Sequence, residues 1–174
     1  MKIGVMNDIH DNIGNLLKSF EVFHENRVNK VFFCGDLNSP FTIDYFKKIK
    51  VPVLAVFGNN EGDKISIARR VKINNLDFKY APKQGLMWDL TLEGKRIGIY
   101  HGSQEEILEG LLASGNFDIF LSGHNHICHI EKVKKTLWIN PGCVCGYAGL
   151  DIDPVKPSVA ILNLSTSKAD IIIL

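Results

Sequence analysis

The sequence lacks an export signal, a long apolar run and an excess of charge of one sign. Residues 1–6 form an apolar run that is too short for a signal peptide and that ends in the polar pair Asn7-Asp8. No stretch reaches the length of a membrane-spanning helix. With 20 basic and 19 acidic residues, the net charge of +1 gives no reason to expect a nucleic acid or an anionic membrane as partner. We therefore expect a cytoplasmic protein with neither kind of partner.

Cysteine is scarce, and its spacing predicts no ligand cluster. The four cysteines are Cys34, Cys128, Cys143 and Cys145, and three of them lie in or beside apolar segments, where a free thiol behaves as a small hydrophobic group. Without an export signal they are expected to stay reduced. For the Cys143-x-Cys145 pair we expect adjacent buried thiols rather than a redox pair or a zinc site.

Proline is also scarce, with 6 residues in 174, and 45% of the chain is hydrophobic. That composition is typical of a globular protein and excludes a disordered chain. The length predicts one domain, residues 1–174, which can bury a core without disulfides.

The first half of the chain alternates apolar runs with helical periodicity. This β-α-β-α-β order predicts parallel strands joined by right-handed helical crossovers. The strands are expected at residues 3–6, 30–34 and 53–57, and the helices at about 16–23, 41–49 and 65–71.

The second half of the chain does not continue this regular alternation of strands and helices. Residues 87–92 and 96–100 predict a hairpin around Glu93-Gly94-Lys95, followed by a helix at 105–113. Further strands are expected at 119–121, 137–139, 159–164 and 170–174. We expect an α/β sheet that becomes antiparallel in its second half, folded as two layers of sheet.

Five of these strands end in side chains that can bind metal ions: Asp8 and His10, then Asp36, Asn59, His101, and finally His124 and His126. In open α/β sheets, ligands bind beyond the carboxyl ends of the strands. Mixed oxygen and nitrogen ligands suit Mn, Fe, Ni, Co or Zn, and the absence of a thiolate cluster argues against a structural zinc. Seven ligands are about right for two ions. In an extended chain, Asp8 and His10 are expected on one face, with Ile9 turned into the core.

The order and spacing of these motifs resemble those of the calcineurin-like metallophosphoesterases. The short length and two further segments, Asn59-Asn60-Glu61-Gly62 and Asn140-Pro141-Gly142, resemble the compact YfcE-like prokaryotic branch. The motifs are Asp8-x-His10, Gly35-Asp36, Gly58-Asn59, His101-Gly102 and Gly123-His124-x-His126. The resemblance implies an α/β fold, a four-layer α-β-β-α sandwich with mixed sheets.

The resemblance also implies a ligand scheme for two divalent cations, with manganese preferred and nickel, iron, cobalt or zinc also fitting. Asp36 would bridge the two ions, and Asn59 and His101 would also act in catalysis. The first ion would be held by Asp8, His10 and His126, and the second by Asn59, His101 and His124.

The sequence departs from the family's pattern at four positions, one of which is Ser103, which follows His101-Gly102 where some relatives have a further histidine. Asn60 stands where larger members have a histidine that helps the leaving group depart, so that acid step is in doubt here. Asn125 stands where threonine is common, and Cys143 where serine is common. None of these changes removes a predicted ligand.

The implied activity is hydrolysis of a small phosphoester, preferentially a diester, by a hydroxide that two metal ions activate for in-line attack. The alternative is a catalytically weak protein-interaction scaffold like the retromer subunit Vps29, which should have lost at least one ligand. A Cys-His hydrolase using Cys143 with His124 or His126 would leave the other five ligands unexplained.

Other positions have ordinary structural interpretations. His24 is expected on the surface, His129 in a strand, and Asp11-Asn12 at the cap of the first helix. Asn140-Pro141-Gly142 is either a simple turn or a support for the metal cluster. A homodimer with Trp88, Tyr147 or Phe41 in its interface stays open; ordinary surface placement explains these aromatic residues equally well.

Overall fold

The computed structural model describes residues 1–148 and 153–174 and contains two main β-sheets. The first sheet has the order β13-β12-β1-β2-β3-β4. Strands β1 to β4 are parallel, and β12 and β13 add to them in antiparallel fashion beside β1. The bounds are β1 Lys2–Met6, β2 Lys30–Phe33, β3 Val53–Ala55, β4 Phe78–Tyr80, β12 Ser158–Asn163 and β13 Lys168–Ile173.

The second sheet has the order β5-β6-β7-β9-β8. Its bounds are β5 Met87–Leu92, β6 Lys95–Tyr100, β7 Ile119–Leu121, β8 His129–Val133 and β9 Thr136–Asn140. A small separate ribbon joins β10 (Tyr147–Ala148) to β11 (Asp153–Pro154). The predicted hairpin of β5 and β6 is confirmed.

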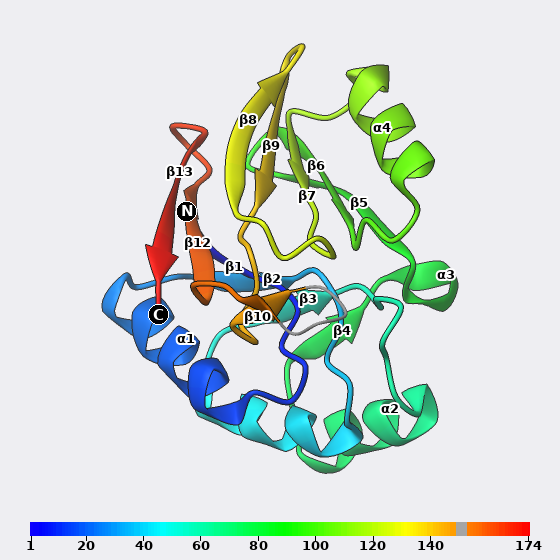
Figure 1. The fold of residues 1–174 in the computed structure, drawn as a ribbon, viewed down its shortest axis with the longest axis vertical. Helices are drawn as coiled ribbons and strands as arrows, with labels where there is room; N and C mark the ends of the chain where they lie inside the picture. Colours follow the sequence, from blue (N-terminus) through cyan, green and yellow to red (C-terminus); the bar gives the residue numbers. More distant parts are fainter. Residues whose placement is uncertain (149–152) are drawn as a thin grey trace.

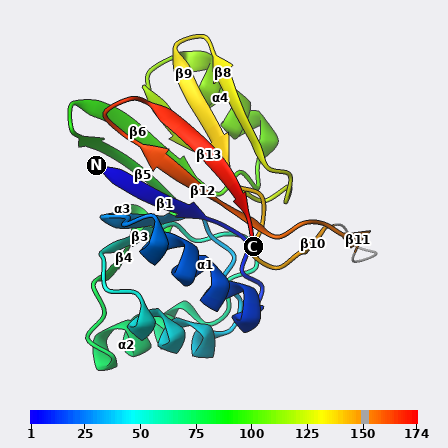
Figure 2. The same cartoon turned by 90° about the vertical axis from the view of Figure 1, so that its left-hand side faces the viewer.

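Helices cover the outer faces of both sheets (Figures 1 and 2). Helix α1 (Ile13–Glu25), the 3-10 helix η1 (Pro40–Lys48) and helix α2 (Lys64–Ile73) lie on the first sheet, and helix α4 (Glu105–Ser114) lies on the second. The one-turn helix α3 (Pro82–Gly85) links the two halves. The predicted four-layer α-β-β-α sandwich with mixed sheets is therefore confirmed. No helix in the described ranges is long and apolar enough to cross a membrane.

The side-chain alternation of the strands creates two separate cores in the first sheet. In β1, Ile3 and Val5 point between the two sheets, whereas Met6 packs beneath the helices. In β2, Phe32 and Phe33 divide in the same way. A strand that buries both faces needs a continuous apolar run, which is the pattern of residues 31–34.

The helix expected near residues 41–49 is a 3-10 helix rather than an α-helix. Its apolar residues Ile43, Phe46 and Ile49 recur at a spacing of three, and side chains three apart line up along a 3-10 helix. Asp11 fixes the start of the segment because its carboxylate accepts hydrogen bonds from Ser39 N and the Thr42 hydroxyl.

The expectation that the second half is antiparallel was wrong for its centre. β6, β7 and β9 are parallel, and only the outer pairs β5–β6 and β8–β9 run antiparallel. The reason is that α4 carries the chain back across the sheet, so that β7 starts at the same edge as β6. The third predicted strand ends at Ala55 instead of residue 57, because Phe57 N bonds to Gly85 O outside the sheet.

Phe46 offers a test of how η1 is held on the sheet. Its side chain is 1% exposed and makes edge-to-face contacts with Phe20 and Phe78. Phe46→Ala should lower the free energy of unfolding by about 3–5 kcal/mol, measured by urea denaturation. Phe41→Ala is the matched control: Phe41 lies in the same helix but is 65% exposed, so its loss should cost less than about 1 kcal/mol. Equal losses for the two variants would contradict this packing.

Candidate metal centre

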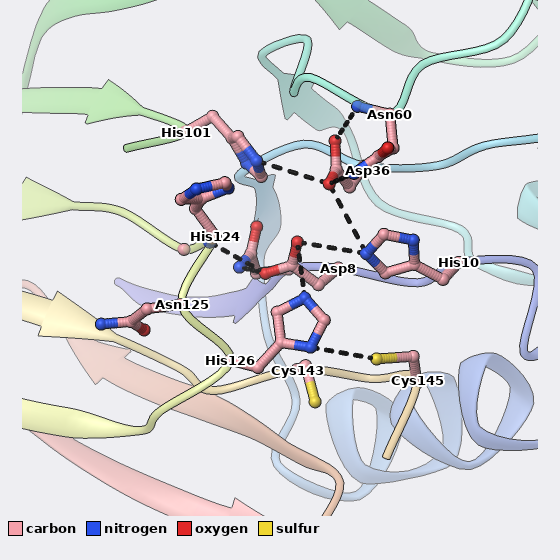
Figure 3. Close-up of polar contacts among 12 residues, drawn as sticks. Asp8, His10, Asp36, Asn60, His101, His124, Asn125, His126, Cys143 and Cys145 are labelled. Atoms are coloured by element: carbon pink, nitrogen blue, oxygen red, sulfur yellow. Dashed lines mark hydrogen bonds and ion pairs between the residues drawn. The ribbon is translucent and has the colours of Figure 1, made fainter. Parts of the chain in front are cut away.

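The seven residues predicted as ligands lie together beyond the carboxyl ends of β1, β2, β3, β6 and β7. All of them except Asn59 are labelled in Figure 3. Because β1 to β3 are parallel neighbours, their ends meet at one edge of the first sheet. The ends of β6 and β7 come from the second sheet. The centre therefore lies where the two layers meet.

Asp8 and His10 follow β1, but not in the extended conformation that was expected. Their φ angles are 48° and 42°, in the left-handed region that Asp and His tolerate better than most residues. Backbone bonds impose this turn: Asp8 N donates to Gly35 O, and Ile9 N and His10 N both donate to Asp36 O. We had placed Asp8 and His10 on one face because side chains alternate along an extended chain, and that reason was wrong. The placement itself holds, since both side chains face the centre and Ile9 is fully buried.

Asp36 lies between two histidines and is 1% exposed. Its Oδ2 lies 3.5 Å from His10 Nε2 and 3.5 Å from His101 Nε2. Asn60 donates from its backbone N (2.7 Å) and its Nδ2 (2.9 Å) to the same carboxylate. Burial would raise the pKa of Asp36, but the contacts with His101 and Asn60 outweigh it and lower that pKa. Asp36 is therefore an ionised carboxylate, and the two hydrogen bonds from Asn60 hold it in place.

His101 presents Nε2 to the centre because its Nδ1 lies 2.8 Å from Cys34 O, a carbonyl that can only accept. Asn59 Oδ1 lies 2.9 Å from that Nε2. The ring of His124 lies beside His101, with 5.1 Å between ring centroids. The backbone N of His124 donates to Asp8 Oδ2 at 2.9 Å. Asn59, His101 and His124 thus form one side of the centre, with Asn59 and His124 exposed.

His126 presents Nε2 to the opposite side. Its Nδ1 bonds to Tyr147 O, and its Nε2 lies 3.4 Å from Asp8 Oδ1. Burial would lower the pKa of His126, but the contact with Asp8 raises it to about 10. The environment thus favours positive charge next to Asp8.

Two buried atoms indicate that a metal cation can supply the positive charge beside Asp8. Asp8 Oδ1 and His10 Nε2 are buried and have no hydrogen-bond partner within residues 1–148 and 153–174, and they lie 3.6 Å apart. Ligands at about 2.0–2.2 Å from one ion lie roughly this far from each other. Two sets of donor atoms lie within 4.8 Å of one another, Asp8 with His10 and His126, and Asp8 with Asp36 and His101. Carboxylate and imidazole donors in this arrangement fit a divalent transition-metal ion.

Sequence reasoning missed Glu61, which joins two of the ligand loops. Its Oε1 accepts from Asp36 N at 3.0 Å and from Gly58 N at 3.2 Å. Gly58 itself has no room for a side chain, because a Cβ there would lie 2.0 Å from Asp36 Oδ1. An acidic residue two positions after a predicted ligand was the available signal, but nothing in the sequence shows that it turns inward.

Asn140 supports the loop that carries the last two histidines. Its Nδ2 donates to Gly123 O at 3.0 Å and to Asn125 Oδ1 at 2.8 Å. Of the two interpretations of residues 140–142, the structure thus favours the supporting role. Helix α1 is capped by Asn12, whose side chain accepts from Asn15 N, as expected.

The remaining candidates lie outside the centre. His24 is exposed on α1, and the ring of His129 packs against Trp138 at 4.0 Å between centroids. Trp88 is half-buried and donates its indole N–H to Ala55 O. Cys143 is fully buried and lies on the Nδ1 side of His126, whereas Asp8 lies on the Nε2 side. A buried thiol on that side is badly placed for a nucleophile that must reach a substrate.

A cluster of carboxylates and imidazoles at strand ends is an arrangement that can bind divalent metal ions. The chain matches the sequence profile of the calcineurin-like phosphoesterase superfamily domain over residues 1–167. It is 33% identical over 150 residues to the phosphodiesterase MJ0936 of Methanocaldococcus jannaschii, covering 84% of this chain and 86% of that relative. The chain therefore belongs to the calcineurin-like phosphoesterase superfamily, and it is a hydrolase.

Solved structures agree with this assignment. The structure of an archaeal phosphodiesterase superposes over 100% of both chains, with a TM-score of 0.87 and 31% identity. Zinc-bound Vps29 of Entamoeba histolytica (TM-score 0.70, 18% identity, 99% of both chains) and YfcE of E. coli (TM-score 0.64, 18% identity, 99% of both chains) share the fold. The resemblance to the compact branch is thus confirmed at the level of fold.

The buried carboxyl of Glu61 predicts a pH dependence of stability in the metal-free protein. Burial and the nearby charge of Asp36 raise its pKa from 4.5 to about 7, although the backbone N–H donors oppose this. Ionisation therefore costs more in the folded state, and stability falls as pH rises from about 4.5 to 7. At about 1.4 kcal/mol per pH unit of pKa shift, the loss is about 3 kcal/mol.

Glu61→Gln should remove this part of the pH dependence, since the amide keeps an oxygen for the two N–H donors but cannot ionise. The measurement is urea denaturation of the metal-free variant and of the unchanged protein between pH 4.5 and 7.5. Glu109→Gln, at an exposed position of α4, is the control and should change nothing. Superimposable curves for Glu61→Gln and the unchanged protein would refute the assignment.

Proposed function

We propose that this phosphoesterase is a dinuclear phosphodiesterase that hydrolyses a small phosphoester. The observation that carries the proposal is the position of Asp36, whose Oδ2 is 3.5 Å from both His10 Nε2 and His101 Nε2. A carboxylate equidistant from two groups of donors can serve both. Asp8, His10 and His126 would hold one ion, and Asn59, His101 and His124 the other, with Asp36 shared.

Two divalent cations held by these residues would supply Lewis-acid chemistry, which polarises phosphoryl oxygens and lowers the pKa of water. Manganese is the preferred ion, and nickel, iron, cobalt and zinc also suit mixed carboxylate and imidazole ligands. The chain itself prepares the donors: Cys34 O fixes the ring of His101, and Tyr147 O fixes that of His126. Such second contacts orient each ring so that its Nε2 is aimed at the centre, where it would bind a metal ion.

Asn59 is suited to meet the substrate. It is exposed, while its Oδ1 lies within 2.9 Å of His101 Nε2. A neutral amide adds no negative charge facing an anionic phosphoester. Asn59 and His101 are therefore the residues we place at the reacting phosphate.

The leaving group receives little help from the chain. Asn60 stands where a histidine acid would be needed, and both its backbone N and its Nδ2 are bound to Asp36. An amide in that role holds the bridging carboxylate and cannot donate a proton as an acid would. The similarity to a protein named as a phosphodiesterase supports a diester over a monoester.

The first test is hydrolysis of bis-p-nitrophenyl phosphate by protein loaded with manganese or nickel. Asp36→Asn and His101→Ala should each lower kcat by about a hundredfold or more, since metal ions contribute several kcal/mol of transition-state stabilisation. His24→Ala, which changes an exposed histidine of α1, is the control and should keep full activity. Circular dichroism would establish that each variant is folded.

The result also separates the enzyme from the scaffold alternative that the Vps29 fold raises. If the metal-loaded protein cleaves no phosphoester and binds no second ion, the scaffold interpretation is correct.

The second test concerns the leaving group. Without a side-chain acid, the rate should depend on the acidity of the leaving alcohol, so p-nitrophenyl diesters should be cleaved much faster than alkyl monoesters. The measurement is kcat/KM for a series of esters whose leaving groups differ in pKa. Equal or faster cleavage of unactivated alkyl monoesters would disprove the dependence. Asn60→His supplies the missing acid and should flatten the series.

A further inference from the structure

Two thiols lie behind His126, on the side away from the predicted centre (Figure 3). Cys145 Sγ lies 3.5 Å from His126 Nδ1 and 3.3 Å from Tyr147 O, and Cys143 Sγ lies 3.7 Å from the same carbonyl. Cys143 and Cys145 are 0% and 3% exposed, and neither forms a disulfide. Hydrolysis uses neither thiol.

The donor atoms of this group have the spacing of a metal site. Cys143 Sγ, Cys145 Sγ and His126 Nδ1 all lie within 4.8 Å of one another. Around a tetrahedral zinc ion, with about 2.3 Å to sulfur and about 2.0–2.1 Å to nitrogen, a sulfur and a nitrogen lie about 3.5 Å apart. The observed 3.5 Å between Cys145 Sγ and His126 Nδ1 is that separation.

The two sides of His126 differ in chemistry. On the Nε2 side the neighbouring donors are the carboxylate of Asp8 and the ring of His10, which suit harder transition-metal ions. On the Nδ1 side they are two sulfur atoms, which select soft ions such as zinc, cadmium or copper(I).

We infer that Cys143, Cys145 and Nδ1 of His126 form a separate site for a thiophilic divalent cation, zinc or cadmium. The ion would have three protein ligands, and its fourth position is open to water or to the carbonyl of Tyr147. Binding requires loss of the thiol protons and of the proton that His126 Nδ1 now shares with Tyr147 O. These protons pass to solvent, so binding strengthens as pH rises.

This site shares the His126 ring with the predicted dinuclear centre. An ion on Nδ1 replaces the bond to Tyr147 O that now orients the ring. A thiophilic cation would therefore act on the first catalytic ion through one ring, which would bridge the two ions as an imidazolate. The site itself does not require the protein to be a phosphodiesterase.

The test is titration of the reduced, metal-free protein with cobalt(II), followed by absorption spectroscopy. Thiolate ligation gives an intense sulfur-to-cobalt charge-transfer band in the near ultraviolet, whereas carboxylate and imidazole ligands give only weak visible bands. We expect the band in the unchanged protein and its loss in the Cys143→Ser/Cys145→Ser double variant. Cys128→Ser, at an exposed cysteine outside this group, is the matched control and should keep the band.

Two further measurements keep the outcome clear. X-ray absorption at the zinc edge of the zinc-loaded, unchanged protein should show sulfur at about 2.3 Å, and it needs no variant. Asp36→Asn should keep the charge-transfer band while phosphodiesterase activity is lost, because Asp36 contacts neither thiol. Absence of both the band and the sulfur scattering, or a band that persists in the double variant, would overturn the site. Loss of activity alone bears only on the dinuclear proposal.

Discussion

The burial of two carboxylates side by side is the constraint on which the rest of this structure depends. Asp8 and Asp36 are 0% and 1% exposed, and they follow β1 and β2, whose last residues Met6 and Phe33 are paired in register. Buried charges of like sign destabilise a fold unless they are compensated. The compensation comes from two directions: the histidine rings, and the N–H groups of Asn60 and His124. Every loop at this edge is shaped by the need to provide one of these groups.

The sequence predicted the membership of the centre well and its local geometry poorly. Strand ends are easy to recognise because apolar runs stop at polar residues, so Asp8, Asp36 and His101 were placed correctly next to one another. The left-handed conformation of Asp8 and His10 was missed, because it is imposed by hydrogen bonds to Gly35 O and Asp36 O, from a strand more than twenty residues away. The ligand roles and the number of ions remain predictions.

Sequence patterns did not identify residues that support the ligand loops without being predicted ligands themselves. Glu61 reads as one more surface acid, and only the folded chain shows that it accepts from two buried backbone groups. The fold shows the same division. Long periodic elements such as α1 were predicted, whereas the three-residue strand β4 was not, because its pairing with β3 rather than its own residues defines it. Such elements are determined by contacts between distant parts of the chain, and local sequence patterns do not show these contacts.

The contacts of residues 144 and 145 have a consequence for how the chain folds. Asn12 and Asn15 donate to Cys145 O and Val144 O, and Val144 N and Cys145 N donate back to Asn7 O and Asp8 O. These bonds join residues about 130 positions apart, and β12 then pairs with β1 from still further along the chain. Contacts over such separations form late, because the loop between them must be closed first. During synthesis, the carboxylates of the first strands are complete long before the segment that encloses them leaves the ribosome. The nascent chain therefore passes through a period in which these acidic groups are open to solvent, and the enclosed site is a property of the finished chain alone.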